Sequence, residues 1–166
     1  MRQVIYATAL FSTCFLLLIP TSGFTQLALE LAPKEESKLI EALKSPELKE
    51  GMVFTIEQLF FKADSDDIDS KSFALLDELA KVLNQRTDIK KIEISGHTNG
   101  LPPAAYCDKL STARAQQIYH YLSNKNVDVT RLEYKGYGKN SPIASDDTAI
   151  GRLKNQRVEV KILAME

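Results

Sequence analysis

The sequence predicts an α+β fold in which strands and helices alternate in the order β-α-β-α-β-α-β. Two observations lead to this prediction. Four short segments are rich in β-branched and aromatic residues, which favour strands, and in the segments between them apolar residues recur every three or four positions, which favours helices. The composition, 44% apolar and 26% charged over 166 residues, is that of a globular domain with a sizeable core.

The first 25 residues are typical of a secretory signal peptide. A single charge, Arg2, precedes an apolar run over 4–19, and Pro20 with the small residues after it suits a cleavage site. An uncleaved membrane anchor is the alternative, because roughly 17 to 25 apolar residues can span a bilayer. We expect cleavage near residue 25, which leaves one cysteine, Cys107, and no internal disulfide.

A short helical lead-in over 26–50 precedes the first strand. Apolar residues recur at helical spacing over 39–43, and the Ser-Pro-Glu triplet at 45–47 is typical of the start of another short helix. After Gly51, the β-branched and aromatic residues of 52–61 predict the first strand.

An acidic loop separates the first strand from the next helix. Residues 64–70 include four aspartates, but they lack the glycine and the closing glutamate that a calcium loop requires. A solvated loop that caps a helix is the better interpretation. The apolar stripe over 71–85 predicts that helix, and the isoleucines of 89–96 predict the second strand.

The second half begins with the longest predicted helix, over 104–124. A third strand over 131–137, a short helix over 149–154 and a last strand over 157–163 follow it. Apolar and charged residues alternate in the last strand, so one face of the sheet is expected to be partly exposed. The residues expected to lie along one side of the long helix are Tyr106, Leu110, Ala113, Ile118, Tyr121 and Leu122.

Catalytic motifs are not evident. His97 and His120 have no nucleophile or ligand partner at a fixed spacing, and the glycines of 136–141 match neither a phosphate loop nor a dinucleotide loop. The net charge of −1 and the lack of a basic stripe argue against a nucleic-acid partner. We therefore expect a binding protein without catalytic residues, metal or cofactor; a hydrolase would need a constellation that the sequence lacks.

Four motifs occur in order in the second half. They are Gly96-His97-Thr98-Asn99-Gly100, Leu110-Ser111-Thr112-Ala113-Arg114-Ala115, Gly136-Tyr137-Gly138 and Asn155-Gln156-Arg157-Val158-Glu159. Together they resemble the OmpA-like C-terminal domain, the periplasmic peptidoglycan-binding module of Gram-negative envelope proteins, and the resemblance places that domain at 51–164. It implies an α/β sandwich with a mixed four-stranded sheet and helices packed on one face.

The resemblance also implies a ligand. Members of this family bind the diaminopimelate of the peptidoglycan stem peptide; an aspartate of a GHTD motif takes its ammonium, and the arginine of an LSxxRA motif takes its carboxylate. Arg114 is that arginine, and its guanidinium can give a carboxylate two parallel hydrogen bonds. Asn99 stands in the place of the aspartate. We expect Arg114, Asn99, Thr98, Leu110 and Arg157 to bind the ligand.

Three positions depart from the family pattern: Asn99 replaces the aspartate, Cys107 an asparagine, and Gln156 an arginine. Asn99 removes a charge from a charge-assisted pair, which predicts binding weaker by about 1 kcal/mol and no loss of shape. The departures leave an alternative open. In it, the protein is an envelope adaptor that keeps the fold, has weakened or lost peptidoglycan binding, and uses an exposed Tyr119 and the lead-in to contact another protein.

The resemblance and the signal peptide together predict the location. We expect an exported, periplasmic protein that is associated with the outer membrane and tethers or organises the cell envelope. Its expected partners are peptidoglycan and an outer-membrane or other envelope protein. We expect no transmembrane barrel of its own.

Overall fold

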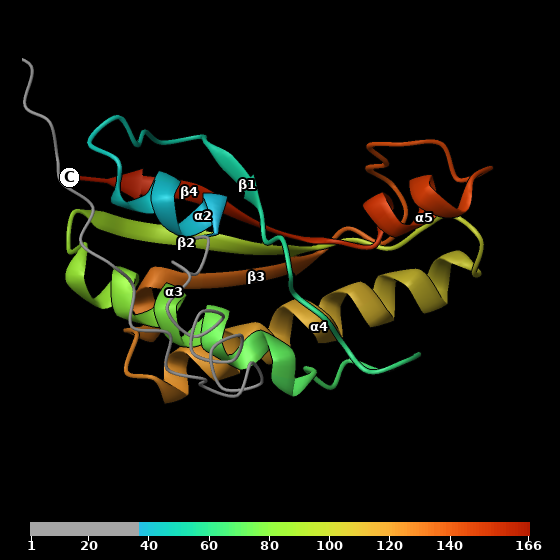
Figure 1. Cartoon of the computed structure of the whole chain (residues 1–166), viewed down its shortest axis with the longest axis horizontal. Helices are drawn as coiled ribbons and strands as arrows, with labels where there is room; N and C mark the ends of the chain where they lie inside the picture. The colour runs from blue at the N-terminus through green and yellow to red at the C-terminus, as the bar shows by residue number, and fades with distance from the viewer. Residues whose placement is uncertain (1–36) are drawn as a thin grey trace, which may run out of the picture. The chain divides into compact units, whose positions relative to one another are not determined.

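The computed structural model describes residues 37–166, which form one mixed four-stranded sheet with helices (Figure 1). The strands are β1 (Val53–Thr55), β2 (Ile89–Gly96), β3 (Leu132–Gly136) and β4 (Val158–Met165), and their order in the sheet is β1-β4-β2-β3. The helices are α2 (Lys38–Lys44), α3 (Phe73–Gln85), α4 (Ala104–Asn124) and α5 (Ala149–Asn155), with 3₁₀ turns η1 (Ser70–Ser72) and η2 (Val129–Arg131). The predicted α+β class and mixed sheet are confirmed. The predicted signal peptide, 1–25, and the first part of the lead-in, 26–36, lie outside the described residues.

The sheet topology brings distant motifs to one end of the sheet. β2 and β3 are parallel and are connected through α4, whereas β4 is antiparallel to both of its neighbours, β1 and β2. Gly96, the last residue of β2, is paired with Gly136 on one side and with Val158 on the other. The loops that follow β2 and β3 and the loop that precedes β4 therefore meet at the same end.

One face of the sheet carries the apolar core. α3 and α4 lie side by side along this face (Figure 1), and the three buried apolar residues of α2 belong to the same core. In β4, every second residue from Val158 to Ile162 is buried and the residues between them are half-buried. The predicted packing of helices on one face and the partly exposed opposite face are confirmed.

Two predictions for residues 45–61 are wrong. No helix starts at Ser45; its hydroxyl oxygen accepts a hydrogen bond from the N–H of Glu47 (3.1 Å), which closes a turn. The first strand is shorter than predicted. It ends at Thr55, and the left-handed φ of 62° at Gln58 is incompatible with a strand that continues to residue 61. Beyond it the backbone N–H of Phe60 donates to the hydroxyl of Ser72 (2.8 Å) in η1 instead of pairing in the sheet.

The buried side of α4 also differs from the prediction. The buried residues are Cys107, Ser111, Ala115, Ile118 and Leu122, whereas Tyr106 is 43% exposed. The reason is a close approach of α4 to the sheet, where a Cβ at Gly96 would collide with the backbone carbonyl of Ser111. Small residues pack there, and this turns the larger side chains of the first half of α4 toward its flank.

We expect Gly96→Ala to lower the free energy of unfolding by about 1–3 kcal/mol, because the added methyl group overpacks the contact with α4. Urea denaturation at equilibrium measures the change. Lys81→Ala, at an exposed position of α3, is the control and should stay within about 0.5 kcal/mol of wild type. Equal stability of Gly96→Ala and wild type would contradict the expected contact.

Candidate ligand-binding site

Backbone hydrogen bonds join three loops at the end of the sheet. The N–H of His97 donates to the carbonyl oxygen of Arg157 (2.9 Å), and the N–H of Thr98 donates to that of Gly138 (2.8 Å). The loop after β2 is thereby held between the residue before β4 and the loop after β3. Side chains on this loop have a defined position relative to α4.

A pocket of about 270 Å³ opens between this loop, α4 and the segment 61–64. Four of the five predicted site residues line it: Thr98, Asn99, Leu110 and Arg114. The fifth, Arg157, lines an adjoining groove instead. The other lining residues, for which the sequence predicted no ligand contact, are Phe61, Lys62, Ala63, Asp64, Pro102, Tyr106 and Gln156.

The guanidinium of Arg114 is held from two sides. Its Nε donates to the backbone carbonyl of Ser65 (3.1 Å), and its Cζ lies 4.9 Å from the centre of the Phe61 ring, a cation–π contact. Burial lowers the pKa of Arg114, and Tyr106 and Asp64 partly offset this effect; the group stays protonated. Within residues 37–166 its terminal nitrogens donate no hydrogen bond, so both are available to a ligand.

Asn99 presents a different chemistry from an aspartate. The residue is 7% exposed, and its Oδ1 accepts a hydrogen bond from the N–H of Leu101 (3.1 Å). Its other polar atom, Nδ2, can only donate. An aspartate at this position could accept from Leu101 with one oxygen and offer the second to an ammonium, whereas Asn99 has a donor there.

Asp64, which was expected only in a solvated loop, is one of the residues that line the pocket. Its backbone has a left-handed φ of 49°, a conformation that aspartate tolerates better than most residues. Its carboxylate has no hydrogen bond or ion pair with any other described residue, and it lies close enough to Arg114 to influence that group's pKa. No motif spacing connects positions 64 and 114, so only the tertiary structure reveals their proximity.

A match to a known protein family shows what kind of domain carries this pocket. The model of the OmpA family matches residues 60–156, more than half of the chain. The chain belongs to the OmpA family. The matched range includes every residue that lines the pocket, from Phe61 to Gln156.

Relatives and solved structures agree with the OmpA family assignment. Outer membrane protein A of Bordetella avium is 38% identical over 104 residues, which cover 63% of this chain and 53% of that protein. The periplasmic domain of Helicobacter pylori MotB has a TM-score of 0.62 at 25% identity, over 71% of this chain and 79% of that one. The cell wall anchor of the T6SS from Pseudomonas aeruginosa has a TM-score of 0.58 at 28% identity, over 68% of this chain and 79% of that one. The chain thus spans about half the length of the Bordetella relative.

The departures from the OmpA family pattern lie around the pocket. Cys107 is fully buried, as expected of a small apolar side chain, and its Sγ lies 3.5 Å from the carbonyl oxygen of Pro102 and 3.6 Å from that of Asn99. It therefore packs beneath the loop that carries Asn99. Gln156 lines both the pocket and the adjoining groove.

Arg157 is engaged within the chain. Its side chain is 6% exposed, its Nε donates to Oε1 of Glu159 (2.7 Å), and its Nη2 donates to the carbonyl oxygen of Ser141 (3.1 Å). These contacts hold the start of β4 against the loop before α5. Such an arrangement favours a positioning role for Arg157 over direct ligand contact.

A buried amide connects α5 to the loop of Asn99. Asn155 is fully buried; its Oδ1 accepts from the N–H groups of Ile143 (2.8 Å) and Ala144 (3.0 Å), and its Nδ2 donates to Asp146 Oδ1 (3.0 Å). Asp146 in turn accepts, through Oδ2, from the N–H of Gly100 (2.9 Å). Asn155, the first residue of the fourth motif, thus supports the loop of the first motif through its own side chain and that of Asp146.

Tyr119 does not have the exposure that the adaptor alternative expects. It is half-buried, and its ring centre lies 5.2 Å from that of Tyr134 and 5.4 Å from that of His120. His120 itself is exposed. The contact surface proposed around Tyr119 is therefore smaller than the sequence suggested.

The acidic loop caps a helical turn, as predicted. The side chain of Asp69 accepts a hydrogen bond from the N–H of Lys71 (3.0 Å) at the start of η1, and Asp67 pairs with Lys62 (3.4 Å). In the described part of the chain, no three or more His, Cys, Asp or Glu side chains gather in a way that could hold a metal ion. No helix between residues 37 and 166 has the length and apolar content needed to cross a membrane.

His97 lies behind the site in a buried charged cluster. Its Nε2 lies 3.3 Å from Oε2 of Glu159, and its ring stacks on Tyr137 with centres 5.3 Å apart. Burial lowers the pKa of His97, the charge of Arg157 lowers it further, and Glu159 and Glu93 partly offset both effects. The folded protein therefore favours the neutral imidazole.

This lowered pKa predicts a loss of stability at mildly acidic pH. Above a pH of about 6.5, the ordinary pKa of histidine, both the folded and the unfolded chain hold neutral His97, and stability is unaffected. As the pH falls below that value, the unfolded chain takes up a proton that the folded chain does not, and stability falls by at most about 1.4 kcal/mol per pH unit. We expect His97→Gln to reduce this slope between pH 7 and 5 in denaturation experiments. His120→Gln, at an exposed position, is the control, and equal slopes for His97→Gln and wild type would contradict the expectation.

Proposed function

We propose that this domain binds peptidoglycan in the cell envelope, without catalysis, by holding the diaminopimelate of a stem peptide in the pocket around Arg114. The observation that carries the proposal is the state of Arg114. Its terminal nitrogens are free among the described residues, while Phe61 and Ser65 fix its orientation. A pre-oriented guanidinium suits a carboxylate, because little side-chain entropy is lost on binding.

The pocket offers the amine of diaminopimelate a weaker binding partner than it offers the carboxylate. Asn99 can offer only the second lone pair of Oδ1, since the first accepts from Leu101. Asp64 offers a full negative charge from the other lining segment, but it is exposed, and water screens its attraction. We therefore propose recognition dominated by the carboxylate end of the ligand.

The relatives support an envelope location. The Bordetella protein is named for the outer membrane, and the Pseudomonas structure is described as a cell wall anchor. We propose that the present protein is exported to the periplasm, lies close to the outer membrane, and tethers or organises the cell wall there. Repeated stem peptides on one polymer would offset weak binding at each site if several copies are presented together.

The direct test is sedimentation with purified sacculi. We expect wild-type protein to sediment with sacculi and Arg114→Ala to stay largely in the supernatant, because the carboxylate loses its charged partner. Lys81→Ala, which removes an exposed positive charge from α3, is the control and should sediment like wild type. Equal amounts of wild type and Arg114→Ala in the supernatant would disprove the proposed contact.

We expect Asn99→Asp to bind a diaminopimelate-containing peptide several-fold more tightly, a gain of about 1 kcal/mol. The aspartate keeps an acceptor for the N–H of Leu101 and adds an anionic oxygen for the ammonium. Titration calorimetry on the two proteins measures the difference. Unchanged or weaker affinity would show that residue 99 does not contact the ammonium.

A further inference from the structure

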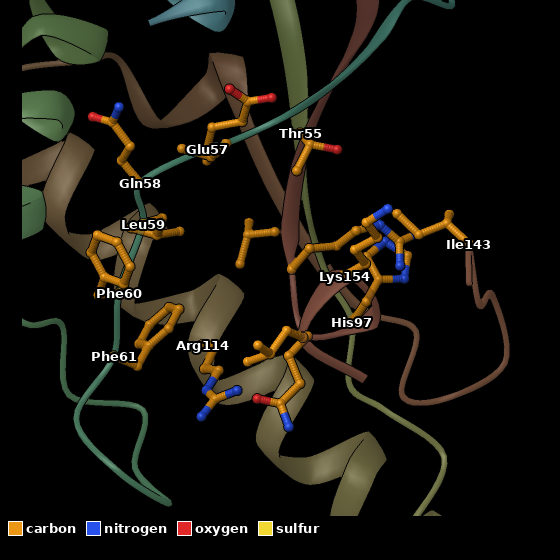
Figure 2. Close-up of a pocket in the computed structure, with 15 residues that line it drawn as sticks. Thr55, Glu57, Gln58, Leu59, Phe60, Phe61, His97, Arg114, Ile143 and Lys154 are labelled. Atoms are coloured by element: carbon orange, nitrogen blue, oxygen red, sulfur yellow. The ribbon is translucent and has the colours of Figure 1, made fainter. Parts of the chain in front are cut away.

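A second, larger groove adjoins the pocket. This groove of about 710 Å³ lies between the segment 55–61 and the residues around α5 and the start of β4 (Figure 2). Phe61, Arg114 and Gln156 line both the pocket and the groove, so the two are adjacent. Its size lies within the range of clefts that bind small molecules and short peptides.

The charge of the groove is mainly positive. Glu57 is the one acidic residue in its lining, and its carboxylate lies 3.4 Å from Nζ of Lys38. Arg157 is occupied by Glu159, and Arg114 faces the pocket as well as the groove. Lys154 is exposed and has no ion pair or hydrogen bond with any other described residue. It lies two positions from Gln156, where the family pattern has a cation.

The remaining lining is apolar and accessible. Phe60 is 50% exposed, Ile143 57% and Leu153 71%. Figure 2 shows Phe60 and Phe61 on one side of the groove and Ile143 with Lys154 on the other. An occupant of this groove would therefore be anionic and would carry small apolar groups.

We propose that the groove binds the part of the stem peptide that precedes diaminopimelate, with Lys154 pairing with the free α-carboxylate of its D-glutamate. This inference rests on the proposed function, because the pocket around Arg114 must hold diaminopimelate for the preceding D-glutamate to reach the groove. The glutamate is linked through its side chain, which leaves the α-carboxylate free. The methyl group of the alanine beside it supplies the small apolar contact for Ile143 and Leu153.

The stem peptide is favoured over other anionic occupants by continuity and by charge. Two adjacent cavities that share Arg114 suit one ligand that carries two carboxylates on neighbouring residues. Lys154 and Arg114 then bind separate carboxylates of the same stem. Lys154 supplies in the groove the positive charge that Gln156 lacks.

The test is titration calorimetry of the full mature chain with two synthetic peptides. One is the tripeptide L-Ala-γ-D-Glu-diaminopimelate, and the other differs only by an amide in place of the glutamate α-carboxylate. We expect the amide to bind wild type roughly two- to fivefold more weakly, the range of an exposed ion pair. Lys154→Gln should weaken binding of the tripeptide by the same factor and remove the difference in affinity between the two peptides. Lys81→Gln is the matched control and should behave as wild type.

The outcomes separate this inference from the proposed function. If wild type binds neither peptide, or if Arg114→Ala binds both as wild type does, the proposed function fails. If the tripeptide binds in an Arg114-dependent manner but its amide binds equally well, the groove inference is overturned and the proposed function stands. If Lys154→Gln weakens both peptides equally, Lys154 contacts a different group and the assignment to glutamate is wrong.

Discussion

The pairing of Gly96 with Gly136 and Val158 is the constraint on which the rest of the site depends. Without side chains at the two glycines, α4 approaches the strand ends so closely that only small residues, such as Ser111, fit between them. That packing turns the flank of α4 that carries Leu110 and Arg114 toward the loop after β2. The pocket therefore results from close backbone packing, and the same packing positions Arg114.

Rigidity and charge have different origins in this site. Arg114 is oriented by an aromatic ring and a backbone carbonyl, so its position does not depend on a neighbouring acid. The negative charge lies instead on the exposed Asp64, because Asn99 has none and uses its oxygen within its own loop. This arrangement is the basis for the proposal that the site holds a carboxylate more firmly than an ammonium.

The loop that carries Asn99 is supported by polar side chains as well as by the sheet. Asn155 is fully buried and all of its hydrogen-bonding groups are used, which is the condition for a buried amide to order its surroundings. Through Asp146, that order extends to the backbone of Gly100. The fourth motif thus has a structural task even though its second position, Gln156, departs from the family pattern.

The periodicity of apolar residues was sufficient to locate most elements, since α3, β2 and β4 follow patterns that depend only on neighbouring residues. It failed after Thr55, where the first strand ends and Gln58 then takes a left-handed backbone, and in α4, where contact with glycines on the strands decides which side is buried. In α4, the buried side is set by a part of the chain that is distant in sequence.

The class of fold, the order of its elements, the family and four of the residues that line the pocket could be predicted from the sequence, because local patterns and ordered motifs carry all of these. Three features are visible only in the folded chain: Asp64 lies near Arg114, Arg157 is occupied within the chain, and a groove with Lys154 adjoins the pocket. The pocket and the groove are built from segments that are tens of residues apart in the chain, and the sheet and the packing of α4 bring these segments together.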